Sequence, residues 1–346
     1  MPAMIDSMMY VGETPWHKEG VKLDRPPTIE EAIEKAGLTW TVKKLPTYSP
    51  NLDNDEEFFG DHASMRTGHF HNWRIDNPLE RGNRKFTPLG AVSERYGVLQ
   101  NREAFAPFDV LLDKGYTLET AGAIQQGRKV WILAKAPDRA FVGDDVIDKY
   151  AFLYTSHDGS TGSQFRPTMI RVVCQNTIDI ALASKRENSY QLKHTSNIKE
   201  RVNQLTDKLR SMDGNVRKAI DDMNRMTEVE MTPQALDAYL EAVVPFLVTR
   251  HKKSNPEQGI LVRNNAKPVY DAMVRNFRHG RGNNGKTLWD AYNAVTEYYT
   301  HDKQYSDWVK GTQFAKPYNY KLQALEVAKR FIKHSKSVVT APIGLN

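Results

Sequence analysis

Residues 156–160, with the sequence SHDGS, combine side chains that could carry out acid–base chemistry. Histidine titrates near neutral pH, so His157 could serve as a general base, with Asp158 orienting it or binding a divalent metal. Successive residues of a strand point to opposite faces, so the two can cooperate only if a turn redirects one of them. Asp158 and Gly159 are also common turn residues, with Ser160 as a side-chain cap. We expect a turn, predict no catalytic residue, and keep a metal-dependent nuclease or hydrolase using His157 and Asp158 as an alternative.

Two other groups of residues have the composition of a reactive or metal-binding site. Cys174, the single cysteine, precedes a possible helix N-terminus that would favour a thiolate, but only distant histidines could act as its base. A buried structural cysteine is therefore the expected role. His69 and His71 alternate as on one face of a strand, with Asp61 and His62 nearby, which would suit zinc or manganese. Their spacing is not typical of a metal motif, so we predict an exposed polar loop and no metal.

Residues 280–287 match the phosphate-loop pattern GxxxxGK[ST]. That pattern indicates phosphate binding when it follows a strand and opens a helix. A predicted helix precedes it here, so ATP binding is the less favoured interpretation and no cofactor is predicted. We expect Thr287 to cap the next helix, whose packing face would hold Trp289, Tyr292, Val295 and Tyr299.

Basic side chains recur where a sheet and its loops could present them together. A protein that binds single-stranded DNA needs cations beside the phosphates and aromatic or amide groups beside the bases. Tyr96, Trp131 and Tyr154 could stack on bases, although aromatic residues within strands more often pack in the core. The predicted nucleic-acid-binding residues are Arg128, Lys129, Arg166, Arg171, Lys185 and Arg186.

The net charge of +6 is unevenly distributed along the 346 residues. From Arg250 onward there are 17 Lys and Arg against 7 Asp and Glu, whereas the chain before it has 31 against 35. An excess of cations often meets a polyanion such as nucleic acid, because neutralised phosphates release counterions. A solvated helical surface is the alternative.

The strongest strand signals lie within residues 118–183. Residues 121–124 and 129–136 flank the run QQGR, which predicts a hairpin with Arg128 and Lys129 at its tip. This hairpin would begin an antiparallel sheet.

Two further strands are predicted at residues 150–156 and 169–174. The loop between them is long for a hairpin and holds Arg166, and long loops in compact domains are often functional. After Cys174 the pattern changes to that of a helix, capped by Asn176 or Thr177, whose end carries the last two predicted cations.

The N-terminal part begins with residues 1–27, which we interpret as an irregular arm. Residues 28–37 predict a short helix with Thr28 as N-cap, Glu31 completing a capping box and Gly37 as terminator.

The following residues predict a strand at 40–45 and a long polar connection at 49–84, with one strand near 64–74. Residues 88–115 predict a strand, a turn, a second strand and then a helix. Asn101 is its expected N-cap, and Pro107 is expected either to kink the helix or to delay its start.

The chain beyond residue 198 is predicted to be helical, with a clear start at Thr232 and Pro233. The fold class is therefore α+β, an antiparallel sheet with helices packed on one face and a mainly helical C-terminal region. We predict a sheet domain over residues 1–195 and a basic helical domain over 196–346. No apolar run is long enough to cross a membrane and no signal peptide is evident, so the expected location is cytoplasmic.

Five ordered motifs suggest a known family: TPLGAVSERYGVLQN, ETAGAIQQGRKVWILAKAP, YAFLYTSHDGS, IRVVCQNTIDIAL and TLWDAYNAVTEYYTHD. Over residues 16–302 the chain resembles the phage/plasmid-like proteins of domain of unknown function 932. The resemblance implies a mobile-element protein of unsettled activity. More remotely, the order of elements resembles single-strand annealing proteins of the Rad and RecT type, which bind DNA along a basic groove of an oligomeric ring.

The combined prediction is a DNA-binding protein of a mobile element that binds or anneals single-stranded DNA in recombination or replication. Its expected partners are single-stranded DNA and further copies of itself, and no membrane. Besides the hydrolase, the remaining alternative is a non-enzymatic protein that interacts with a host factor or regulates it.

Overall fold

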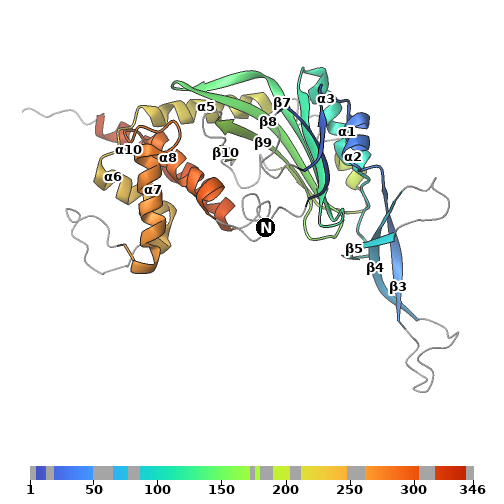
Figure 1. Cartoon of the computed structure of the whole chain (residues 1–346). Helices are drawn as coiled ribbons and strands as arrows, with labels where there is room; N and C mark the ends of the chain where they lie inside the picture. Colours follow the sequence, from blue (N-terminus) through green and yellow to red (C-terminus); the bar gives the residue numbers. More distant parts are fainter. Residues whose placement is uncertain are drawn as a thin grey trace, which may run out of the picture.

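The computed structural model of the 346-residue chain contains two β-sheets and a helical C-terminal region (Figure 1). The residues that it describes are 5–12, 19–49, 65–76, 86–171, 176–179, 190–202, 212–247, 262–303 and 316–339. The predicted α+β class is confirmed.

The main sheet has the strand order β10-β9-β8-β7-β6-β1-β2, with β11 also paired to β9. Its strands are β1 (Ile5–Val11), β2 (Val21–Leu23), β6 (Thr117–Ile124), β7 (Lys129–Val142), β8 (Asp145–Ser156), β9 (Ser163–Arg171), β10 (Asn176–Asp179) and β11 (Tyr190–Leu192). All pairs are antiparallel except β1 with β2. The predicted hairpin is formed by β6 and β7, with Gln125 and Gln126 at positive φ in its turn.

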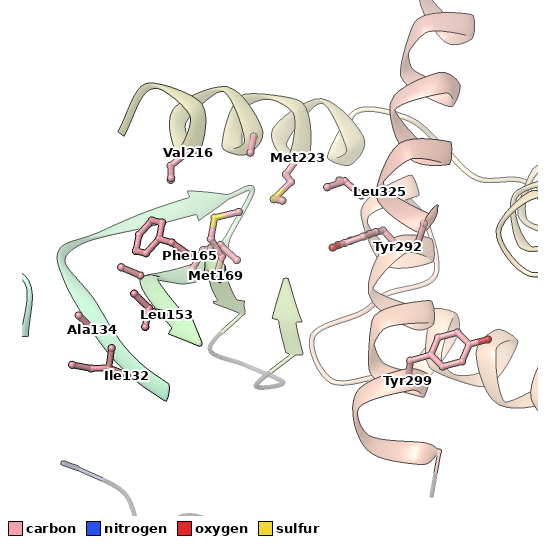
Figure 2. Packing of buried hydrophobic residues seen from close by; sticks show 14 of the residues in the cluster. Ile132, Ala134, Leu153, Phe165, Met169, Val216, Met223, Tyr292, Tyr299 and Leu325 are labelled. Atoms are coloured by element: carbon pink, nitrogen blue, oxygen red, sulfur yellow. The ribbon is translucent and has the colours of Figure 1, made fainter. Parts of the chain in front are cut away.

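One face of the main sheet forms the apolar core. In β7, Val130, Ile132 and Ala134 are fully buried, whereas the alternate residues, among them Trp131, are half-buried on the other face. Helices cover the buried face: α1 (Ile29–Lys35), α2 (Asn101–Phe105), α3 (Asp109–Asp113) and α5 (Met212–Thr227). Figure 2 shows Val216 and Met223 of α5 above Phe165 and Met169 of the sheet.

A second, three-stranded antiparallel sheet consists of β3 (Thr41–Ser49), β4 (Met65–Ile75) and β5 (Phe86–Val92). It extends away from the main sheet and the helices (Figure 1). We call these three strands the β-arm. The sequence predicted its individual strands but not a separate sheet.

Several local predictions are confirmed at the residue level. Thr28 and Glu31 form the capping box of α1, and Gly37 follows its end at φ +65°. Pro107 interrupts its helix as expected, through a short 3-10 segment, η1 (Ala106–Phe108). However, the N-cap of α2 is Gln100, and Asn101 is the first helical residue.

Three predictions about the sheet were wrong. Residues 1–27 are not simply an irregular arm, because β1 lies between β6 and β2 in the main sheet. β9 begins at Ser163, so Arg166 lies on a strand and the preceding loop is only residues 157–162. Residues 176–179 form β10 instead of the start of a helix, because they pair with β9. Local sequence patterns do not show such long-range pairing.

The C-terminal region is helical as predicted. Its described elements are α6 (Pro233–Val243), η2 (Pro245–Leu247), η4 (Asn264–Ala266), α7 (Lys267–His279), α8 (Leu288–Glu297), the π-helical turn η5 (Tyr298–Asp302) and α10 (Lys316–Val339). Thr232 caps α6 with Pro233 in its first turn. Among the described residues, no helix is sufficiently long and apolar to cross a membrane.

Polar contacts attach the helical region to the turn between β7 and β8. Trp289 of α8 donates its indole N–H to Asp145 over 2.7 Å. Asn224 of α5 accepts a bond from the Gly143 N–H at 3.0 Å and donates to the Phe141 carbonyl, also at 3.0 Å. The predicted boundary at residue 195 stays a prediction.

Candidate nucleic-acid interface

The predicted cations occupy different places in the fold. Arg128 is exposed in the turn between β6 and β7, and Lys129 is half-buried at the start of β7. Arg166 and Arg171 lie on β9, but their side chains are outside the described part of the structure. Lys185 and Arg186 lie outside the described residues altogether.

Strand register shows which of these positions share a face of the main sheet. Lys129 pairs with Ser156 of β8, and Arg166 pairs with Phe152. Positions 156 and 152 have the same parity, so the Lys129 and Arg166 positions fall on one face. Arg171 pairs with Ile147 and therefore falls on the opposite face. The sheet thus brings together only part of the predicted set.

Trp131 is one of two half-buried aromatic residues on the shared face, the other being Phe152. It is half-buried, covers Gly122 of β6 so closely that a Cβ there would clash, and donates its indole N–H to Thr120 at 3.3 Å. Tyr96 and Tyr154, the other proposed stacking residues, are only 8 % and 2 % exposed. Trp131 therefore fits a stacking role better than either tyrosine.

At the end of this face that is far from Lys129, acidic side chains neutralise the cations. The Asp148 carboxylate accepts from Lys135 at 2.7 Å and from Arg139 at 3.0 Å, and Lys135 also lies 3.7 Å from Glu119. Burial raises the pKa of Glu119, although the nearby Lys135 opposes this shift. Ion pairing takes up the cations at this end, so the face is not a continuous basic groove.

The β-arm combines basic and aromatic side chains, and none of the cations predicted from the sequence lies on it. Its three strands contain four Lys and Arg residues and no Asp or Glu. The face turned away from the main sheet carries Lys43 beside Trp73, Leu45 beside His71, and Phe86. We call these five residues the arm face.

Side chains of the arm face are accessible to solvent. Phe86 is 55 % exposed and Leu45 is 44 % exposed, Lys43 is also exposed, and Trp73 and His71 are half-buried. The rings of His71 and Trp73 lie 5.9 Å apart. Contiguous exposed patches of apolar and aromatic side chains often mark binding sites. The sequence does contain a signal for this surface, because aromatic and polar side chains alternate along residues 69–75 and Lys43 lies on the preceding predicted strand. The polar residues around 69–75 made this segment look like part of a long connection.

Cations on the inner face of the β-arm stabilise its attachment. Lys44 donates to the carbonyls of Glu94 at 2.6 Å and Tyr96 at 2.9 Å. Arg74 lies 4.9 Å from the centre of the Trp40 ring and forms an ion pair with Asp76 at 2.6 Å. These two cations therefore have structural partners, in contrast to the exposed Lys43.

A buried polar network joins the β-arm to the main sheet and contains His157. Its Nε2 is 2.9 Å from Oδ1 of Asn101, and Asn101 donates its amide N–H to the Leu38 carbonyl at 2.9 Å. Asn72 of β4 donates to the His157 carbonyl at 2.7 Å. Because the amide oxygen of Asn101 can only accept, Nε2 carries the proton. Asn101 thus contributes to the core instead of capping its helix.

The surroundings of the second ring nitrogen of His157, Nδ1, explain why the pKa of this side chain is lowered. Nδ1 is buried and has no hydrogen-bond partner among the described residues, and the Trp40 ring lies 5.2 Å away, edge to face. Burial, with a smaller effect of nearby His194, lowers the pKa of His157 to about 3. The side chain is fully buried. In this conformation His157 cannot reach a solvent-borne substrate as a general base.

Asp158 has a turn role, as expected. Its carboxylate accepts from the Ser160 N–H at 2.8 Å, and Gly159 has φ +75°. A Cβ at Gly90 would lie 2.7 Å from the Asp158 carbonyl oxygen, so this turn packs against β5. His157 and Asp158 are therefore not arranged as a catalytic pair.

The phosphate-loop pattern at residues 280–287 binds a carboxylate of the chain itself. Asp290 accepts backbone N–H bonds from Asn284 at 3.2 Å, Lys286 at 3.0 Å and Thr287 at 2.9 Å. It also accepts the Thr287 hydroxyl at 3.0 Å, and Thr287 caps α8 as predicted. The backbone donors that would bind a phosphate are thus already used, and helix α7 precedes the loop. This geometry gives no support to ATP binding.

No metal site is formed by the described residues, in which no group of three His, Cys, Asp or Glu side chains converges. His69 is exposed and His71 is half-buried on β4. The neighbouring candidates Asp61 and His62, and also Cys174, lie outside the described residues.

Basic residues in the C-terminal region fit the charge asymmetry of the sequence. Residues 262–303 contain seven Lys and Arg and four Asp and Glu. Two of the acids, Asp290 and Glu297, are buried, so the surface of this region is more basic than its composition.

A family model described as a domain of unknown function, DUF932, matches residues 88–330, which is more than half of the chain. No curated protein matches the chain. No solved structure matches it either. The match includes the main-sheet strands from β6 onward and most of the helical region, whereas β3 and β4 precede it. The relation to single-strand annealing proteins stays a prediction. The motifs of the β6–β7 hairpin, of β8 and of α8 all fall inside the matched residues, and the chain belongs to the DUF932 family.

Proposed function

We propose that this protein binds single-stranded DNA and that the arm face is its principal contact with the bases. The observation that carries the proposal is a surface formed by the exposed Lys43, Leu45 and Phe86 and the half-buried His71 and Trp73, on strands without any acidic residue. Bases stack on aromatic rings and cations meet the backbone phosphates, which is the combination that single-strand binding requires. No carboxylate on these strands repels the phosphates.

A sheet surface favours single strands over a duplex. In a duplex the bases are stacked inside, so their flat faces are not available to Trp73 and Phe86. Three strands about 4.8 Å apart form a platform roughly 10 Å wide. The four-stranded sheet of RNA-recognition motifs stacks two or three bases of a single strand, and we expect no more than that number on these three strands.

The β6–β7 turn supplies a second contact. A Cβ at Gly127 would lie 3.0 Å from the Trp40 ring and 3.2 Å from Arg74, so the turn that carries Arg128 lies against the β-arm. This turn contacts the inner face of the β-arm, so a strand that leaves the arm face would have to pass around the edge of the β-arm to reach Arg128, Lys129 and Trp131. This path retains part of the cation set predicted from the sequence.

The biological role is proposed from the resemblance. A phage- or plasmid-borne protein that binds single strands would act in recombination or replication, and annealing would follow if several copies bind strands side by side. We therefore propose a homo-oligomer as the active form. Size-exclusion chromatography with light scattering, with and without oligonucleotide, tests this part, and a monomer under both conditions would exclude it.

Binding is tested with a fluorescently labelled oligothymidylate, measured by anisotropy at two salt concentrations. Trp73→Ala should weaken binding by about 5- to 150-fold, because stacking contributes roughly 1–3 kcal/mol per base. Lys43→Gln should reduce the slope of log K against log salt by about 0.7. Lys43 is exposed, so this second variant does not endanger folding.

Phe141→Ala is the matched control, because Phe141 is 59 % exposed near the β7–β8 turn, remote in sequence from the β-arm. It should bind like the wild type. Absence of binding by the wild-type protein at low salt would refute the proposal. Equal losses in Trp73→Ala and Phe141→Ala would refute the assignment to the arm face.

A further inference from the structure

The loop between α7 and α8, residues 280–287, presents basic side chains on the surface of the helical region. Arg278 and His279 lie in the last turn of α7, and Lys286 lies two residues before the start of α8. All three side chains are exposed, and none forms an ion pair within the part of the chain that the structure describes. A Cβ at Gly285 would lie 3.2 Å from the Cα of Arg278, so the loop packs against the end of α7 and Lys286 lies near Arg278. We call Arg278 and Lys286 the loop cations, and the exposed His279 lies beside them.

The acidic side chains of the helical region do not neutralise the loop cations. Three have other partners and two are buried: Asp237 with Tyr270, Asp271 with Lys267, Asp302 with Arg275, and the buried Asp290 and Glu297. Glu230 is exposed and pairs with Thr287 in an isolated β-bridge. Successive residues of an extended segment point to opposite sides, so Glu230 does not face Lys286.

Helix electrostatics explain only part of this arrangement. The helix dipole favours cations in the last turn of a helix, which accounts for Arg278 and His279 at the end of α7. Lys286 lies at the other kind of end, one residue before Thr287, the N-cap of α8, where a positive charge is unfavourable. The stability of α8 therefore does not account for a cation at position 286, whereas a negatively charged partner would compensate for it.

Hydrogen bonds fix the course of the loop. Asn283 donates its side-chain amide to the carbonyl of Asn276 at 2.8 Å and to the carbonyl of Asp290 at 3.2 Å. The Asp290 carboxylate holds the backbone N–H groups of the following residues, as described above. The loop cations therefore extend from an ordered backbone, which lowers the entropy that is lost when they bind a partner.

The composition of the loop indicates which kind of partner it fits. Residues 278–287 contain no Trp, Tyr, Phe or aliphatic side chain. The loop can therefore neither stack on bases nor insert into a lipid surface. A protein partner would also find no apolar contact here, although the centre of a protein interface is usually apolar. Phosphates, in contrast, need only cations, and Lys and Arg neutralise them regardless of base sequence.

We propose that the loop cations bind the phosphate backbone of DNA, in a duplex as well as in a single strand. Figure 1 shows α7 and the β-arm at opposite ends of the molecule. The site is thus separate from the arm face and does not depend on the function proposed for it. A protein with both sites holds a single strand at the β-arm and a duplex at the helical region.

Anisotropy of a fluorescently labelled blunt duplex, measured at two salt concentrations, tests the proposal. The double variant Arg278→Gln/Lys286→Gln should bind more weakly and reduce the slope of log K against log salt by about 1.8, because each neutralised phosphate contributes about 0.9. Arg217→Gln/Lys218→Gln removes one Arg and one Lys from exposed positions of α5 and is the matched control. It should leave the slope unchanged.

Trp73→Ala separates this site from the arm face. It should bind the duplex like the wild type, because the bases of a duplex are not available for stacking. Loss of duplex binding in Trp73→Ala would place the duplex on the arm face and overturn the proposal. Equal changes of slope in the two double variants would show a general effect of net charge and would also overturn it. A wild type that does not bind the duplex at low salt excludes DNA as the partner of the loop, whether or not oligothymidylate binds the arm face.

Discussion

Acidification to pH 5 should destabilise the protein through His157, the fully buried histidine at the joint between the β-arm and the main sheet. Its native pKa is about 3, mainly because burial disfavours the charged form, while its ordinary value is 6.5. Above pH 6.5 the ring is neutral in both the folded and the unfolded chain. Below pH 6.5 only the unfolded chain takes up the proton, so stability falls as the pH drops toward 3.

The magnitude follows from the two pKa values. A pH of 5 is about 1.5 units below the pKa of histidine in the unfolded chain, and each unit corresponds to 1.36 kcal/mol. The free energy of unfolding should therefore fall by about 2 kcal/mol. The pKa of His194 is also lowered, first by burial, so it adds a loss of the same sign. Asp6 and Glu119 have pKa values raised by burial and act in the opposite direction. A difference between variants is therefore more informative than the wild-type curve alone.

The assay is urea unfolding of the full chain at pH 8, 6 and 5, followed by circular dichroism. His157→Gln removes the titrating ring and should reduce the loss between pH 8 and pH 5 by about 2 kcal/mol. His69→Gln changes an exposed histidine and should leave the loss unaltered. If His157→Gln does not fold, nitrogen NMR of the wild-type imidazole should still show a neutral His157 ring at pH 5. An unchanged pH dependence in His157→Gln, or a protonated ring at pH 5, would refute the reasoning.

Three further predictions concern single buried contacts. Asn101→Ala should destabilise the protein by about 3 kcal/mol in urea unfolding, because two buried partners lose their hydrogen bonds, whereas the exposed Asn197→Ala should change it little. Asp290→Ala should also lower the free energy of unfolding by about 3 kcal/mol, because four hydrogen-bond donors lose their acceptor. Mg-ATP should not raise the melting temperature of the wild type, and an ATP-induced increase would contradict the assigned role of the loop. Asp145→Ala should weaken docking of the helical region by about 1.5–3 kcal/mol, seen as faster hydrogen exchange around Trp289, and unchanged exchange there would show that the apolar contacts suffice.

Local chemistry made some elements predictable. Capping residues satisfy the free N–H groups of a helix within a few residues, so Thr28, Thr232 and Thr287 marked helix starts correctly. The β6–β7 hairpin was predictable for the same reason, because its turn and both strands are contiguous. These interactions span a few residues and leave a pattern in the sequence.

Pairing between distant segments was not predictable in this way. β1 gains its strand conformation by pairing with β6, more than one hundred residues away, and β10 by pairing with β9. Arg166 was assigned to a loop because the strand around it is only evident beside β8. Hydrogen bonds to a neighbouring strand, absent from any local pattern, determine these conformations.

The candidate site shows the same division. The sequence alone predicted the α+β class, the basic C-terminal region, the capping role of Thr287 and the turn at Asp158. These features were predictable because they depend on composition or on interactions between residues close in sequence. Only the tertiary structure decided that Asn101 closes a buried network with His157, and that Lys43, Trp73 and Phe86 share one exposed surface. The physical reason is that a side chain's environment depends on what the fold brings against it, and these neighbours come from strands and turns far apart in the chain.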